Sequence, residues 1–244
     1  WEKRRLPKIE SPLFVSQFDI PCTHSGKVAI AYSGGKDSMW NLWWASEKYG
    51  MENILLIHVK NLNPGQNSEE AKYAERQFKE FGVKNHVIIE LSNGSQNNGF
   101  SVMRSRDMFL AGISVPVALM FGASRILVEG FAEETDDEHF TGSSSNMRFF
   151  NEILKAWHIP VRVAWRNRKE MDCVKDLYCN RPEWMPYVCN CFTRICYKIP
   201  HQKRCREKFP TLSPYDSQCG FCIKCRIINI GRILYSPEKI ANRD

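Results

Sequence analysis

The chain has few long apolar runs, and none that looks like a membrane span. Its longest apolar stretch, residues 111–122, is interrupted by Pro116 and is shorter than the roughly 20 residues a helix needs to cross a bilayer. The first residues also lack the charged, apolar and small-residue order of a secretory signal. We therefore predict a soluble, cytoplasmic protein without a membrane partner. In that setting, disulfides are not the first explanation for its ten cysteines.

Internal repeats are absent, and so is the GxxxxGK[ST] loop of the common nucleotide triphosphatases. A length of 244 residues allows one large α/β domain with a solid core, or two small domains. The net charge of +7 suits a protein that handles polyphosphate or nucleic acid. Ordinary solvated lysines and arginines explain so modest a surplus just as well.

Apolar, strand-like runs alternate with segments of helical period along most of the chain. This alternation predicts an α/β fold with a doubly wound parallel sheet, in which ligands bind at the carboxyl ends of the strands. The predicted strands are 28–32, 54–59, 87–90, 125–130 and 161–164. The predicted helices are 38–49, 67–81, 107–121, 146–157 and 169–177. We expect an extension at 1–26, the α/β domain at 27–178 and a compact cysteine-rich segment without regular period at 179–244.

The most informative segment, residues 33–38, has the sequence SGGKDS and lies where the first predicted strand passes into a helix. Small residues there let successive backbone N–H groups face one anion, and the dipole of the following helix adds positive charge. Serine hydroxyls and a lysine can bind phosphate, and an aspartate can cap the helix or hold Mg²⁺. The predicted ligand is the pyrophosphate part of ATP. The predicted contacts in this segment are Ser33, Gly34, Gly35, Lys36, Asp37 and Ser38.

Adenine is expected at the ends of the first two predicted strands. The residues nearest to it would be Ala31, Tyr32 and His58, and main-chain groups would provide most of the contacts. We expect His58 to act as a polar residue at a strand end rather than as a catalyst.

Three thiols form a CxxCxxC run at Cys219, Cys222 and Cys225. Cysteines at this spacing can reach one tetrahedral ion, and nearby lysine and arginine charges favour the thiolate form. The candidates for a fourth ligand are Cys189, Cys191, Cys196, Cys205 and His201. Zinc is the first expectation, and an iron–sulfur cluster, which would shift the chemistry toward sulfur transfer, is its competitor.

The SGGKDS segment resembles the PP-loop of the ATP pyrophosphatases, which split ATP between its α and β phosphates and adenylate a substrate oxygen. Over residues 27–226 the chain further resembles the 7-cyano-7-deazaguanine synthase family. The matching features beyond the loop are Gly65-Gln66 with Glu69 and Glu70, Arg106-Asp107, Gly130, Lys169-Glu170 and the CGxCxxC run. Several features depart from the family: Asp107 replaces an amide, Ile228 stands in place of an arginine, and the 142–148 segment lacks a carboxylate. An insertion over 192–218 would also separate Cys191 from the cysteine run.

This resemblance implies adenylation of 7-carboxy-7-deazaguanine by ATP with Mg²⁺, followed by attack of ammonia and a second round that yields the nitrile. The implied catalytic residues are Lys36, Asp37, Arg106 and Lys169, with Gly130 at the nucleotide, and Glu133 and Glu134 would help to position the substrate. A structural Zn²⁺ would take Cys191 as its fourth ligand. A second copy of the chain is a further expected partner, because dimers are common in such folds.

Three alternatives stay open. The activated carboxylate could be coupled to an amine of a protein or another macromolecule, as the altered 142–148 segment and the basic residues between 194 and 208 would suit. The chain could instead thiolate tRNA, although no obvious catalytic cysteine pair lies near the SGGKDS segment in the sequence. Finally, a protein that only binds nucleic acid could use a basic zinc-bound tail.

Overall fold

In the computed structural model, the described residues are 26–60, 67–91, 106–128, 144–165, 169–189 and 222–236. They form one five-stranded parallel sheet with the order β3-β2-β1-β4-β5. The strands are β1 (Val28–Ala31), β2 (Ile54–Lys60), β3 (His86–Glu90), β4 (Arg125–Val128) and β5 (Arg162–Trp165). The main helices are α1 (Lys36–Tyr49), α2 (Asn67–Glu80), α3 (Arg106–Phe121), α4 (Ser144–Ala156), α5 (Glu170–Asn180) and α8 (Ile223–Tyr235). The prediction of an α/β fold with a parallel sheet is confirmed.

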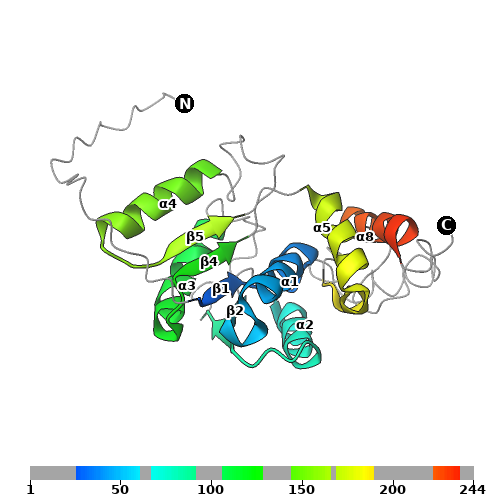
Figure 1. Ribbon diagram of the computed structural model, residues 1–244, viewed down its shortest axis with the longest axis horizontal. Helices are drawn as coiled ribbons and strands as arrows, with labels where there is room; N and C mark the ends of the chain where they lie inside the picture. Colours follow the sequence, from blue (N-terminus) through cyan, green and yellow to red (C-terminus); the bar gives the residue numbers. More distant parts are fainter. Residues whose placement is uncertain are drawn as a thin grey trace.

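Helices cover both faces of the sheet, as alternation along the buried strands requires. In β1, Val28 and Ile30 face one cluster of buried residues, whereas Ala29 between them faces another. The first cluster contains side chains of α1, α2 and α5, and the second contains side chains of α3 and α4. Figure 1 shows this arrangement, with α3 and α4 on one side of the strands and α1 and α2 on the other. The double winding expected from the sequence is therefore present.

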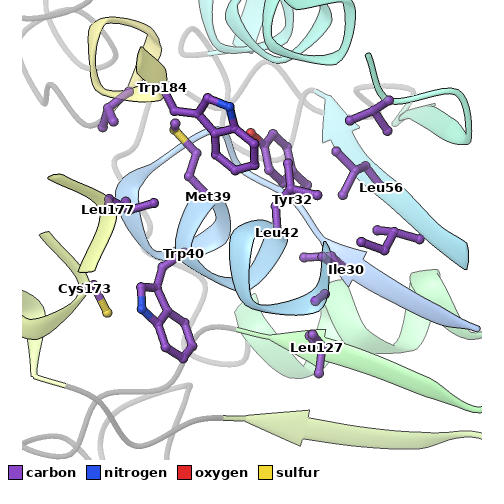
Figure 2. Packing of buried hydrophobic residues seen from close by; sticks show 14 of the residues in the cluster. Ile30, Tyr32, Met39, Trp40, Leu42, Leu56, Leu127, Cys173, Leu177 and Trp184 are labelled. Carbon is purple, nitrogen blue, oxygen red and sulfur yellow. The ribbon is translucent and has the colours of Figure 1, made fainter. Parts of the chain in front are cut away.

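Helix α1 lies at the centre of the first cluster. Figure 2 shows its residues Met39 and Leu42 in this cluster, with Ile30 and Tyr32 on the sheet side and Leu177 of α5 on the other. All five side chains are almost fully buried. The residues that lead into and through α1 are thus held by packing on two sides, which positions the loop that precedes the helix.

After residue 178 the described parts, 179–189 and 222–236, contain two helices that the sequence pattern did not predict. A 3₁₀ helix, η3 (Pro182–Tyr187), buries Trp184 against Phe81 with ring centroids 4.5 Å apart. Further on, α8 packs along α5 (Figure 1). Gly231 makes this close approach possible, because a Cβ atom there would overlap Val174 of α5. The predicted domain boundaries remain a prediction.

None of the helices in the described part of the chain combines the length and the apolar character needed to cross a membrane.

Candidate functional site

The SGGKDS segment forms the predicted strand–loop–helix turn. Strand β1 ends at Ala31, Gly35 is the N-cap, and α1 begins at Lys36, two residues earlier than the sequence pattern predicted. Gly34 has a φ of +81°, a conformation that favours glycine. Lys36 and Asp37 therefore belong to the first helical turn, where the positive end of the helix dipole lies. The N-cap, Gly35, has no side chain to cap this turn, and the Asp37 carboxylate accepts hydrogen bonds from Lys36, so the capping role of Asp37 remains a prediction.

The turn lies at the switch point of the sheet. From β1 the chain builds outward through β2 to β3, and then returns to place β4 on the other side of β1. In doubly wound sheets the crevice between two such neighbouring strands, at their carboxyl ends, is where ligands bind. Asn41 of α1 bridges this point, because its Nδ2 donates a 3.3 Å hydrogen bond to the carbonyl of Val128 at the end of β4.

Gln77 of α2 holds the loop in place through buried hydrogen bonds. Its Nε2 donates to the Gly34 carbonyl at 2.9 Å and to the Tyr187 carbonyl at 2.6 Å, while its Oε1 accepts the Tyr32 hydroxyl at 2.8 Å. The backbone N–H of Cys189 also donates to the Gly34 carbonyl, at 2.9 Å. The sequence analysis did not identify Gln77. The sequence feature that could have indicated it is a polar residue on the buried face of a helix, next to Phe78 and one turn after Ala74.

The two loop serines bond to the loop itself. The Ser38 hydroxyl accepts from the Ser33 N–H and donates to the Gly35 carbonyl, both at 3.2 Å. The Gly35 N–H in turn donates to the Ser33 hydroxyl at 3.3 Å. An anion in the loop would replace these internal partners, so their predicted contacts with phosphate stay a prediction.

Lys36 lies at the centre of a chain of alternating charges. Its fully buried Nζ donates to both carboxylate oxygens of Asp37, at 2.8 and 2.7 Å, and lies 3.3 Å from Oε1 of Glu170 at the start of α5. The same Glu170 oxygen accepts a 2.6 Å hydrogen bond from Lys224 of α8. Four residues from three distant parts of the sequence thus meet beside the loop.

Burial and charge act in opposite directions on the two carboxyl groups. For Asp37, burial is the larger influence and raises its pKa, although the charge and the hydrogen bond of Lys36 oppose the shift. For Glu170, burial would raise the pKa, but the hydrogen bond from Lys224 and the charges of Lys36 and Lys224 together outweigh it and lower the pKa. Glu170 is therefore firmly ionised at neutral pH.

Lys169 and Arg106 are less clearly connected to the site. Lys169 is the N-cap of α5 and is exposed, so within this Lys-Glu pair it is Glu170 that contacts the loop lysine. Arg106 begins α3, but its side chain lies outside the described part of the structure, as do Gly130, Cys191 and Cys219. Their predicted roles remain predictions.

Tyr32 and His58 support the loop from the sheet. The Tyr32 ring is buried against Phe78, with centroids 5.6 Å apart, and burial raises the pKa of its hydroxyl. His58 Nδ1 lies 2.9 Å from the Tyr32 carbonyl, which can only accept, so this nitrogen carries the proton. Burial lowers the pKa of His58, so the ring is neutral at pH 7. Its buried Nε2 has no hydrogen-bond partner among the described residues.

Two cysteines of the CxxCxxC run lie at the start of α8. Cys222 is the N-cap of the helix, and the buried Cys225 packs against it one turn further on. A helix N-terminus favours thiolates, so this pair suits the softer metals that sulfur binds. Within the described residues no three metal-ligating side chains come together, and the zinc site remains a prediction.

Comparisons with known proteins do not name a family. No protein-family model matches the chain, and no curated protein matches it either. Solved structures similar to it include the U34-tRNA thiolase NcsA from Methanococcus maripaludis with its 4Fe-4S cluster, at 15% identity and a TM-score of 0.49, over 85% of this chain and 71% of that one. Another is the glutamine-dependent NAD⁺ synthetase from Acinetobacter baumannii with ADP, at 16% identity and a TM-score of 0.34, over 64% and 36%. At these scores the likeness carries no assignment of a reaction, which has to rest on the residues of the site.

Proposed function

We propose that this chain is an ATP-dependent enzyme of the PP-loop type that adenylates a substrate oxygen. The observation that carries the proposal is the position of Lys36 and Asp37. Both lie in the first turn of α1, behind a glycine loop, at the switch point of a parallel sheet. Backbone N–H groups, a helix dipole and a lysine converge there, and such a site favours a polyphosphate.

The residues of the loop would divide the work. Lys36 would turn from the two carboxylates toward the β and γ phosphates and stabilise the departing pyrophosphate. The Gly35 N–H and the hydroxyls of Ser33 and Ser38 would exchange their mutual hydrogen bonds for phosphate oxygens. Mg²⁺, which arrives with ATP, would supply charge neutralisation, and Asp37 is the loop residue whose carboxylate suits it.

For the substrate, we propose 7-carboxy-7-deazaguanine, on the strength of the sequence motifs that resemble the 7-cyano-7-deazaguanine synthases. Its carboxylate oxygen would attack the α-phosphorus of ATP and release pyrophosphate. Ammonia would then attack the acyl carbon and release AMP, giving the amide. The amide oxygen would be adenylated by a second ATP, and loss of AMP and two protons would give the nitrile. Arg106 and Lys169 would position the substrate.

The Cys189 contact favours one second candidate, thiolation of tRNA. The sequence showed no catalytic cysteine pair near the loop, and the support for this candidate is one buried cysteine, Cys189, whose backbone N–H donates to the Gly34 carbonyl. Cys191 follows two residues later. A Cys189 persulfide, formed by exchange with a persulfide donor, could attack the adenylated base and displace AMP. Attack by a second thiol, such as that of Cys191, would then release the thiolated base and leave a disulfide.

One incubation separates these functions. Purified protein would be mixed with 7-carboxy-7-deazaguanine, ATP, Mg²⁺ and ammonia, and the products identified by mass spectrometry. We expect free nitrile, with two AMP released for each nitrile. AMP without free nitrile would instead indicate transfer to an amine of a macromolecule.

Two further measurements complete the test: the nucleic-acid binding of an Asp37→Ala variant and metal analysis of the protein. No AMP from any substrate, together with full nucleic-acid binding by Asp37→Ala, would contradict the enzymatic assignment. Iron and acid-labile sulfide, and sulfur transfer to tRNA in place of nitrile, would favour the thiolase. Zinc without iron would exclude a tRNA thiolase that uses an iron–sulfur cluster.

A further inference from the structure

Lys224 links the start of α8 at residues 222–225, called here the cysteine turn, to the candidate ATP loop at residues 33–38. It lies between Cys222 and Cys225 on the first turn of α8, and its Nζ donates to Oε1 of Glu170 at 2.6 Å. That oxygen also faces the buried Nζ of Lys36, at 3.3 Å. Oε1 of Glu170 is therefore shared by Lys36 of the loop and Lys224 of α8.

The shared oxygen places the two ammonium groups in competition. Lys36 has no solvent exposure, so its charge depends on the groups around it, and in the nucleotide-free chain Asp37 and Glu170 both contact it. To reach a phosphate, Lys36 has to weaken these contacts. A second cation on the Glu170 oxygen reduces the attraction of Glu170 for Lys36 and also repels Lys36 directly.

We propose that Lys224 is a positioning residue of the ATP site, which holds Glu170 and so allows Lys36 to leave that carboxylate for the phosphates. This inference rests on the proposed use of ATP and goes beyond it by giving the cysteine turn a part in nucleotide binding. Lys224 acts through Glu170 rather than through contact with the nucleotide.

The packing of α8 on α5 keeps the pair of side chains in register. Glu170 begins α5, and α8 is fixed along that helix by the close approach of Gly231 to Val174 and by a 3.4 Å hydrogen bond from Tyr178 to the Ile228 carbonyl. Lys224 and Glu170 each keep about a quarter of their side-chain surface exposed, at 26% and 25%. Either side chain can therefore be replaced without leaving a cavity in the buried core.

The test is a double-mutant cycle on ATP affinity. Isothermal titration with MgATP would be applied to the full chain, to Lys224→Met, to Glu170→Gln and to the double variant. We expect Lys224→Met to raise the Kd for ATP about tenfold, the order of one charged hydrogen bond. In the Glu170→Gln background the same change should alter Kd less than twofold, because residue 170 then carries no negative charge for Lys224 to hold away from Lys36.

Two further variants serve as controls. Lys224→Arg keeps a cation on Glu170 and should stay within about threefold of the unchanged protein. Lys79→Met removes an exposed charge at the far end of α2 and should leave Kd unchanged. Circular dichroism melts would show that each variant is folded, so that a loss of affinity is not a loss of structure.

An equal loss of affinity from Lys224→Met in both backgrounds, or no loss in either, would overturn the inference while leaving ATP binding established. Failure of the unchanged protein to bind ATP at all would overturn the proposed function, and this inference with it.

Discussion

Replacing Gly34 with alanine tests the geometry of the loop more directly than any other single change. The residue has a φ of +81°, and a Cβ atom built there would lie 2.8 Å from Oε1 of Gln77, closer than real Cβ contacts. Two costs follow. The left-handed conformation costs an alanine about 1–2 kcal/mol, and the displaced Gln77 amide loses at least one buried hydrogen bond at about 1–3 kcal/mol.

The expected decrease in the free energy of unfolding is therefore about 2–5 kcal/mol. That is a large part of the roughly 5–15 kcal/mol that stabilises a typical domain. The bonds at risk are the ones that Gln77 makes to Tyr32, Gly34 and Tyr187, all of which hold the loop against α2 and η3. The loop should become mobile as well as less stable, so MgATP affinity should fall with it.

Urea unfolding, followed by circular dichroism and tryptophan fluorescence, measures the change. Gly122→Ala is the matched control, because Gly122 has nearly the same φ, +78°, but has open space around the position of its Cβ. It should lose only the conformational part, about 1–2 kcal/mol. In a Gln77→Ala background, which removes the overlap, Gly34→Ala should cost no more than this control. Equal costs for Gly34→Ala and Gly122→Ala in the unchanged background would refute the contact with Gln77.

Three further predictions concern the rest of the site. Gly231→Ala should lower the free energy of unfolding because the new methyl group overlaps Val174, and Val174→Ala should restore part of the loss. Gly112→Ala is the control: its methyl group would lie at ordinary contact distance from Phe150, so it should be neutral or slightly stabilising, and equal decreases in the urea midpoint for Gly231→Ala and Gly112→Ala would contradict this. The fold lowers the pKa of Glu170 from 4.5, so ionised Glu170 stabilises the protein above pH 4.5, and this stabilisation is lost as the pH falls through the lowered pKa. The free energy of unfolding of a Glu170→Gln variant should therefore fall less steeply between pH 5 and pH 3, and urea midpoints that change in parallel with pH for the two proteins would count against the ion pairs. Elemental analysis should find about one zinc per chain, and Cys222→Ser or Cys225→Ser should abolish it and loosen α8, seen as faster amide hydrogen exchange, while full metal content in both variants would exclude this pair as ligands.

Local patterns account for the part of the fold that the sequence predicted. Each strand is an apolar run, and the SGGKDS segment combines small residues with a following helical period, so the strand–loop–helix turn could be located to within two residues. Helix α8 escaped prediction although its buried residues Cys225, Ile228 and Gly231 recur at helical spacing. Only one of these three is a large apolar residue, whereas Ile223, Ile230 and Ile233 are exposed, so the face that packs on α5 is not marked by the isoleucines.

By itself, the sequence determined that a glycine-rich loop with Lys36 and Asp37 would follow the first strand of a parallel sheet, because that outcome depends on neighbouring residues. Only the tertiary structure decided what surrounds this loop. Gln77, Glu170 and Lys224 come from three helices that are far apart in the sequence, and no local period links them. Burial gives these contacts their strength, since a charge or an amide removed from water must find its partner in the fold, and only the packing of α2, α5 and α8 around α1 supplies those partners.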